Sequence, residues 1–136
     1  MQFTAFSPPD WTSPPPARQA SALRALYATP TGSVDTAVLL PTQPRLAVLG
    51  LIGYGSSTPL TRVELLTVVE LTACLSMWTI TETVQRPNLR ATRVACALGH
   101  CRDIVYGTAV FTGALDARRN PTSVSVAQIT HVRDLT

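Results

Sequence analysis

The residues most capable of chemistry are four arginines within the segment 86–102: Arg86, Arg90, Arg93 and Arg102. No acidic residue interrupts this segment. Arginine is charged at every physiological pH, and its planar fork of donors matches the oxygens of a phosphate. The cluster therefore predicts a patch that binds an anionic surface, either nucleic acid or an anionic membrane.

A second interpretation of these arginines stays open. They can lie on a solvated sheet edge, or they can pair across a subunit interface with the acidic residues Glu64, Glu70 and Glu82. Tyr106 is the only aromatic residue in that region of the sequence. A single-strand binder that stacks bases on aromatic rings is therefore less favoured.

Ligand-type atoms also occur at Cys96, His100, Cys101 and His131. A structural zinc site usually uses a close pair such as Cys-x2-Cys, and a Cys-x4-Cys spacing with His100 between does not have that form. Neighbouring residues of a strand point to opposite faces, so His100 is poorly placed to activate Cys101. We predict no metal, no cofactor and no catalytic dyad.

The cysteines and the N-terminus bear on the compartment. With Cys74 the cysteines number three, an odd count, and no basic, apolar signal sequence opens the chain. We expect three reduced, mostly buried thiols, and a cytoplasmic or virion location without secretion by a signal peptide. The apolar stretch 63–84 contains three glutamates, which excludes a transmembrane helix there.

A helix is expected over 62–75, because Thr61 and Glu64 match a capping box and Pro59 fits a helix entry. The same residues also alternate as a long strand would, and this alternative stays open. One helix on a curved antiparallel sheet resembles the hot-dog architecture in element order from Arg45 to Val132. The resemblance implies a small enzyme or ligand-binding protein with Glu64 or Glu70 at its site.

The N-terminal residues 1–17 form a proline-rich extended arm. The arm carries Phe3, Phe6 and Trp11, which need a surface to bury against. That surface is either the chain's own domain or a neighbouring subunit. We predict that these three side chains contribute to assembly.

The remaining residues 18–136 are expected to form a single α+β domain. Helix is predicted over 18–28, where alanine is frequent, and strands over the other apolar segments. The predicted strands are 34–40, 45–52, 78–84, 89–98, 102–111 and 122–132, with a loop at 113–121. The last four strands would make an antiparallel meander that carries Arg118, Arg119 and His100 toward the arginine cluster. The fold class is an antiparallel sheet of about five or six strands with one or two helices packed on it.

The surface is poor in charge. All eleven basic residues are arginine, lysine is absent, and charged residues make up 14% of the chain with a net charge of +3. Such a surface resists association weakly. We therefore expect a non-enzymatic structural protein that assembles with copies of itself, in the setting of a small virion component such as a coat, matrix or phage head or tail part.

Overall fold

The computed structural model describes residues 22–40, 42–53, 63–80, 86–101 and 103–136. The elements within these residues are β1 (Leu23–Ala28), β2 (Val34–Leu39), α2 (Pro44–Ile52), the 3-10 turn η1 (Val63–Leu65), β3 (Leu66–Thr72), β4 (Leu75–Ile80), α3 (Leu89–Ala97), β5 (Ala109–Thr112) and α4 (Val126–Leu135). The predicted arm residues Phe3, Phe6 and Trp11 lie outside the described residues, as does Arg102.

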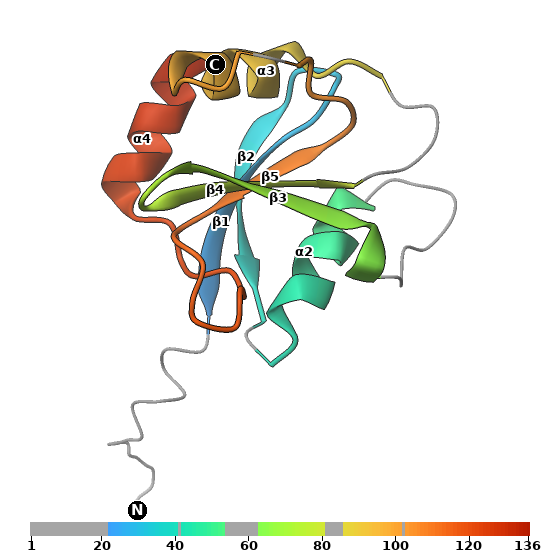
Figure 1. The fold of residues 1–136 in the computed structure, drawn as a ribbon, viewed down its shortest axis with the longest axis vertical. Coiled ribbons are helices and arrows are strands. Elements are labelled where there is room, and N and C mark those ends of the chain that lie inside the picture. The colour runs from blue at the N-terminus through green and yellow to red at the C-terminus, as the bar shows by residue number, and fades with distance from the viewer. Residues whose placement is uncertain (1–21, 41, 54–62, 81–85, 102) are drawn as a thin grey trace, which may run out of the picture.

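The strands form one five-stranded antiparallel sheet in the order β2-β1-β5-β4-β3 (Figure 1). The short strand β5 lies at the centre, between β1 and β4, and β2 and β3 are the two edges. The α+β class with an antiparallel sheet is therefore confirmed. The predicted meander is wrong, because two of its four segments are helices. The central strand of the sheet, β5, pairs with β1 from outside the predicted meander.

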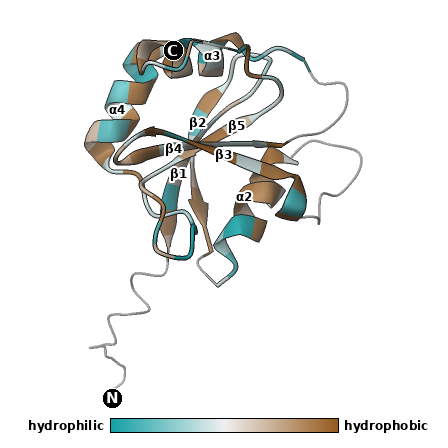
Figure 2. Ribbon diagram, viewed as in Figure 1, coloured by the Kyte–Doolittle hydropathy of each residue, from teal (hydrophilic) through white to brown (hydrophobic). Residues whose placement is uncertain are grey.

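Helices cover both faces of the sheet. Helices α3 and α4 share a hydrophobic cluster with one face, through Val94 and Val132 on the helices and Phe111 on β5. Helix α2 shares a second cluster with the other face, where Val48 packs with Trp78. In Figure 2 hydrophobic residues gather on the strands and on α2, whereas α4 alternates along its length.

Burial on both faces explains why β1 was predicted as helix over 18–28. In β1, Ala25 belongs to the cluster beneath α2, and Leu26 and Ala28 belong to the cluster beneath α3 and α4. A strand buried on both sides shows no alternation of polar and apolar residues. Tertiary burial then outweighs the helical preference of its alanines and leucines.

The segment 45–52 was predicted as a strand and is helix α2. Pro44 occupies its first turn, where a missing N–H costs nothing. The buried residues Val48, Leu49 and Ile52 are three or four positions apart and form one face. A short apolar run is compatible with either element, and the proline before it was the informative signal.

The helix predicted over 62–75 is wrong, and the alternative is correct in its β-conformation, although a turn at 73–74 divides the single long strand into two. Residues 66–72 form β3 and residues 75–80 form β4, paired as a hairpin from Leu66–Ile80 to Thr72–Leu75. Glu64 lies in the 3-10 turn that precedes β3. The apparent capping motif was a local coincidence, since period-two packing on the sheet decides the conformation.

Two further predicted strands, 89–98 and 122–132, are helices α3 and α4. Asn88 caps α3 through its side chain, and Gly99 ends it with a φ of 95°. Ser125 and Gln128 form a capping box at the start of α4. These caps were present in the sequence, but the β-branched residues between them favoured a strand.

The remaining secondary-structure predictions agree with the structure in full or in part. The strand predicted over 34–40 is confirmed as β2, and the loop at 113–121 is confirmed. Of the strand predicted over 102–111, only the end belongs to β5. None of the helices in the described segments is long and apolar enough to cross a membrane.

Candidate functional site

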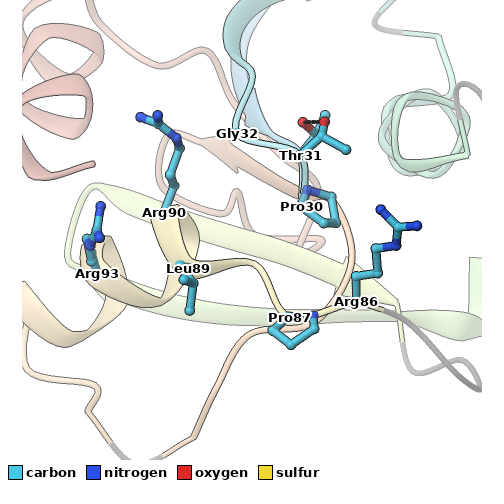
Figure 3. Close-up of a pocket in the computed structure, with 9 residues that line it drawn as sticks. Pro30, Thr31, Gly32, Arg86, Pro87, Leu89, Arg90 and Arg93 are labelled. Atoms are coloured by element: carbon cyan, nitrogen blue, oxygen red, sulfur yellow. Dashed lines mark hydrogen bonds between the residues drawn. The ribbon is translucent and has the colours of Figure 1, made fainter.

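Three of the four predicted arginines surround one cavity of about 560 Å³. The cavity is lined by Arg86, Arg90, Arg93, Pro87 and Leu89 together with the turn between β1 and β2, residues 29–32. In Figure 3, Arg90 and Arg93 extend from α3, and Arg86 extends from the other side of Pro30. The structure thus brings together three members of the predicted patch, and the fourth, Arg102, lies outside the described residues.

The helical conformation of α3 is what gathers these arginines. Arg90 and Arg93 are three positions apart. On a helix such residues are neighbours, whereas on the strand predicted over 89–98 they would point to opposite faces. The strand predicted over 89–98 therefore separates two arginines that the helix places side by side at the cavity.

Asn88 holds the first turn of α3 in place. Its side chain is fully buried, and its Nδ2 donates to the main-chain oxygens of Ala28 at 2.9 Å and Gly107 at 2.8 Å. Its Oδ1 accepts a hydrogen bond from the Ala91 amide at 3.1 Å. One side chain thus joins the end of β1, the approach to β5 and the helix that carries two of the arginines.

The opposite wall of the cavity is a tight turn. The Gly32 amide donates to the Thr29 oxygen at 3.0 Å, and the Ser33 amide donates to Thr29 Oγ1 at 3.1 Å. Gly32 has a φ of 103°, which L-residues with side chains rarely adopt. A Cβ there would lie 3.4 Å from Arg90 Nε, at ordinary contact distance, so Arg90 lies directly against the turn.

The described residues give the cavity arginines no aspartate or glutamate partner. None of the described residues that line the cavity is acidic, and the sole ion pair within the described segments joins Arg119 to Glu70. Arg93 Nη1 donates to the Thr136 main-chain oxygen at 3.0 Å. Arg86 and Arg90 have no side-chain hydrogen bond within the described segments. The described lining of the cavity therefore carries three positive charges and no negative one.

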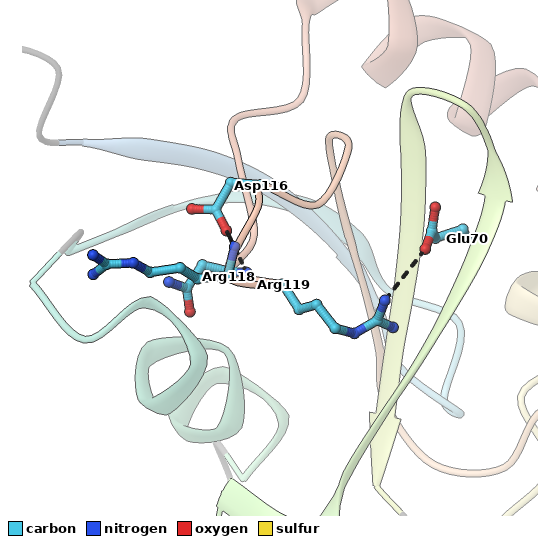
Figure 4. A network of polar contacts seen from close by, with 5 residues as sticks. Glu70, Asp116, Arg118 and Arg119 are labelled. Carbon is cyan, nitrogen blue, oxygen red and sulfur yellow. Dashed lines mark hydrogen bonds and ion pairs between the residues drawn. The ribbon is translucent and has the colours of Figure 1, made fainter.

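Arg118, Arg119 and His100 do not line the arginine cavity. Arg119 Nη1 is 3.7 Å from Glu70 Oε2, in a loop that Asp116 organises by accepting from the amides of Arg118 and Asn120 (Figure 4). In Figure 1 this loop lies at the end of the sheet opposite α3. His100 Nε2 lies 3.1 Å from the Leu71 oxygen. Arg118 and Arg119 therefore lie away from the arginine cavity, and the predicted meander that would have brought them to it is not the observed topology.

The cysteine predictions are wrong in two respects. Cys96 and Cys101 form a disulfide, and neither is buried. Cys74 is free and exposed. The disulfide joins the last turn of α3 to the residue after His100, whose amide donates to the Ala95 oxygen. The helix end thus brings together two thiols that a strand would have separated. Among the described residues no group of three or more metal-ligating side chains occurs.

The acidic residues of the hot-dog resemblance are not on a helix that packs on the sheet. Glu64 is exposed in the turn η1, and Glu70 is exposed on the edge strand β3, next to Arg119. Neither lines the arginine cavity. The central helix on which the resemblance depended is absent from 63–75.

A second candidate surface is the edge strand β2. It pairs with β1 on one side only. Val38 on this strand is 71% exposed, and Leu40 directly after it is 74% exposed. Asp35 is its one charged residue. Sequence reasoning identified the strand but had no means of knowing that it lies at an edge.

Sequence signals for the arginine pocket existed but were assigned to other structures. Asn88 and Gly99 were interpreted as turns between strands, and they are the N-cap and the residue after the C-cap of α3. Their spacing, with an alanine-containing segment between, is typical of a short helix. Comparisons of the chain with protein-family models, with curated proteins and with solved structures found no match, so its function has to be argued from this geometry.

Proposed function

We propose that the protein is a non-enzymatic structural protein that assembles with copies of itself, and that the edge strand β2 is its principal contact. The observation that carries the proposal is the exposure of Val38 and Leu40 along this unpaired edge. Large apolar side chains beside free backbone donors and acceptors are a template for a further strand. A small virion component is the setting we infer from the sparse charge of the chain.

The composition of β2 supports pairing with a second copy. Soluble proteins protect their sheet edges with lysine, proline or β-bulges, and β2 contains neither lysine nor proline. Two copies of one strand can pair antiparallel around a two-fold axis. With the axis at Ala37, the carboxylate of Asp35 lies opposite Leu39 of the other copy, so the two acidic groups do not face each other.

The low charge of the chain removes the usual barrier to such contact. Charged residues make up 14% of the sequence, about half of what an ordinary soluble surface carries. An apolar edge on this background associates with little electrostatic resistance. The predicted arm with Phe3, Phe6 and Trp11 remains a second expected contact.

The test compares oligomeric state across variants by analytical ultracentrifugation over a concentration series. Val38→Lys places a charge at the edge and should weaken self-association at least tenfold. Val126→Lys is the matched control, because Val126 is 65% exposed and belongs to helix α4, which is not part of the sheet. The control should associate as the wild type does.

The outcomes separate the two expected contacts. A wild-type chain that stays monomeric at several hundred micromolar would overturn self-assembly altogether. Assembly that survives Val38→Lys but is lost in a chain lacking residues 1–17 would assign the contact to the arm and not to β2. A complex that depends on both would show that each contributes.

A further inference from the structure

The geometry points to a binding site for a small organic phosphate monoester in the cavity lined by Arg86, Arg90 and Arg93. The three arginines come from two segments and line one cavity, and none of the described residues that line it is acidic. Concentrating like charges raises the energy of the folded protein unless an anion offsets it. An anion of matching charge is therefore the expected occupant.

Arginine and helix geometry favour phosphate. Guanidinium groups bind phosphate through two parallel N–H···O bonds, and three such groups match a dianion better than the single charge of a carboxylate. The cavity also includes Leu89 and Arg90 from the first turn of α3, where the helix dipole adds positive potential. A monoester carries a charge between −1.5 and −2 at pH 7.

The apolar lining indicates that the phosphate carries an organic group. Pro30, Pro87 and Leu89 line the cavity beside the arginines, and Leu89 is 60% exposed. A volume of about 560 Å³ is in the usual range for small-molecule sites and far exceeds the volume of inorganic phosphate. A phosphate held by the arginines would leave space beside these apolar side chains.

A discrete ligand is favoured over a nucleic-acid strand or a membrane. A polyanion is tracked by a continuous line of cations. Here three arginines line one cavity, and Arg119 is paired with Glu70 at the opposite end of the sheet. We therefore assign to these arginines a small ligand with one phosphate group, in place of the nucleic acid or membrane expected from the sequence.

The turn between β1 and β2 provides a specific structural test. Gly32 lines the cavity and has a φ of 103°, which disfavours any side chain, so Gly32→Ala strains the turn that forms one wall of the cavity. Gly99 is a matched control, because its φ of 95° is close to that of Gly32 and it is not among the residues that line the cavity. Both variants carry similar backbone strain, and only one strains the cavity wall.

The experiment titrates the full-length protein with phenyl phosphate, inorganic phosphate and phenol, using calorimetry and amide NMR shifts. Phenyl phosphate should bind saturably and more tightly than either of its parts, with shifts around residues 29–32 and the start of α3. Binding should weaken about tenfold in 0.5 M salt, because the contacts are ionic. It should also weaken as the pH falls below about 6, where the monoester loses its second charge.

The variants identify the residues responsible. Arg90→Gln and Gly32→Ala should each weaken the binding of phenyl phosphate at least tenfold, whereas Arg118→Gln and Gly99→Ala should not change it. The NMR spectrum of each variant reports whether it is folded, and Arg93→Gln replaces any variant that is not. Val38→Lys should bind normally, so this site and the proposed assembly contact can fail separately.

Three outcomes would overturn the inference. The first is phenyl phosphate binding no more tightly than phenol. The second is unchanged binding in both Arg90→Gln and Gly32→Ala. The third is a single-stranded RNA, or a vesicle of phosphatidylserine and phosphatidylcholine, that binds at these arginines and is not displaced by phenyl phosphate, which would assign the site to a macromolecule instead.

Discussion

Replacement of Asn88 is the sharpest test of how the fold builds the arginine pocket. Its side chain makes three hydrogen bonds in a fully buried position, to the Ala28 oxygen, the Gly107 oxygen and the Ala91 amide. Each such bond contributes about 1 kcal/mol to stability, and the last one is also a helix cap. Asn88→Ala should therefore lower the free energy of unfolding by about 3 kcal/mol.

That loss is large relative to the whole. Single domains are stable by about 5–15 kcal/mol, so the variant should remain folded with its thermal midpoint lowered by roughly 10 °C. Urea unfolding followed by far-UV circular dichroism measures the change. Asn120→Ala is the matched control, because Asn120 is partly exposed and only its main chain is bonded. The control should shift stability by about 0.5 kcal/mol or less.

Asn88→Asp tests whether the Asn88 side chain stabilises the fold through its hydrogen bonds or through its shape. The two side chains have nearly the same shape, and the new carboxylate can still cap α3. However, it replaces the amide that donates to two carbonyl oxygens. Burial raises the pKa of the introduced carboxyl, because the charged form is disfavoured in a dry site. Stability should therefore fall as the pH rises above the ordinary carboxyl pKa of about 3.9. A variant as stable as the wild type at pH 7 would refute the reasoning.

Three further predictions concern the core and the disulfide. Ser76 Oγ is buried without a hydrogen-bond partner among the described residues, so Ser76→Ala should raise the free energy of unfolding by about 1 kcal/mol in urea titrations. Thr112→Val should lower the free energy of unfolding by about 2 kcal/mol. The Nε1 of buried Trp78 donates to Thr112 Oγ1 at 2.8 Å and would lose its acceptor. Equal changes in Ser76→Ala and Thr112→Val would contradict the distinction between an unpaired and a paired hydroxyl group. Reduction of Cys96–Cys101, which are five positions apart, should cost about 2 kcal/mol in thermal unfolding with and without reductant, and a Cys96→Ser chain should not respond.

Local sequence was a good guide where a turn or a proline constrained the backbone. The loop at 113–121 and the strand 34–40 were predicted correctly, since glycines and prolines bound them and alternative conformations are few. The class, an antiparallel sheet with helices, was also predicted. The arginine cluster is evident in the sequence, because residue type and spacing along the chain do not depend on the fold.

Errors concentrated where one apolar segment fits two elements. Segments 18–28, 45–52, 89–98 and 122–132 were each assigned the wrong type. The inner strand β1 is buried on both faces, so it lacks the alternation that identifies a half-exposed strand, and the short helices carry β-branched residues. Attention to the caps at Asn88 and Ser125 would have corrected two of these assignments.

By itself, the sequence determined the sparse charge, the absence of lysine and the run of arginines without acids, because these are properties of composition and order. Only the tertiary structure decided that Arg86, Arg90 and Arg93 border one cavity, since that depends on a helix whose first turn is fixed by the buried Asn88. It also decided that β2 is an edge, because strand order arises from long-range pairing of β5 with β1 and β4. Contacts between residues far apart in the chain carry no local signature in either segment.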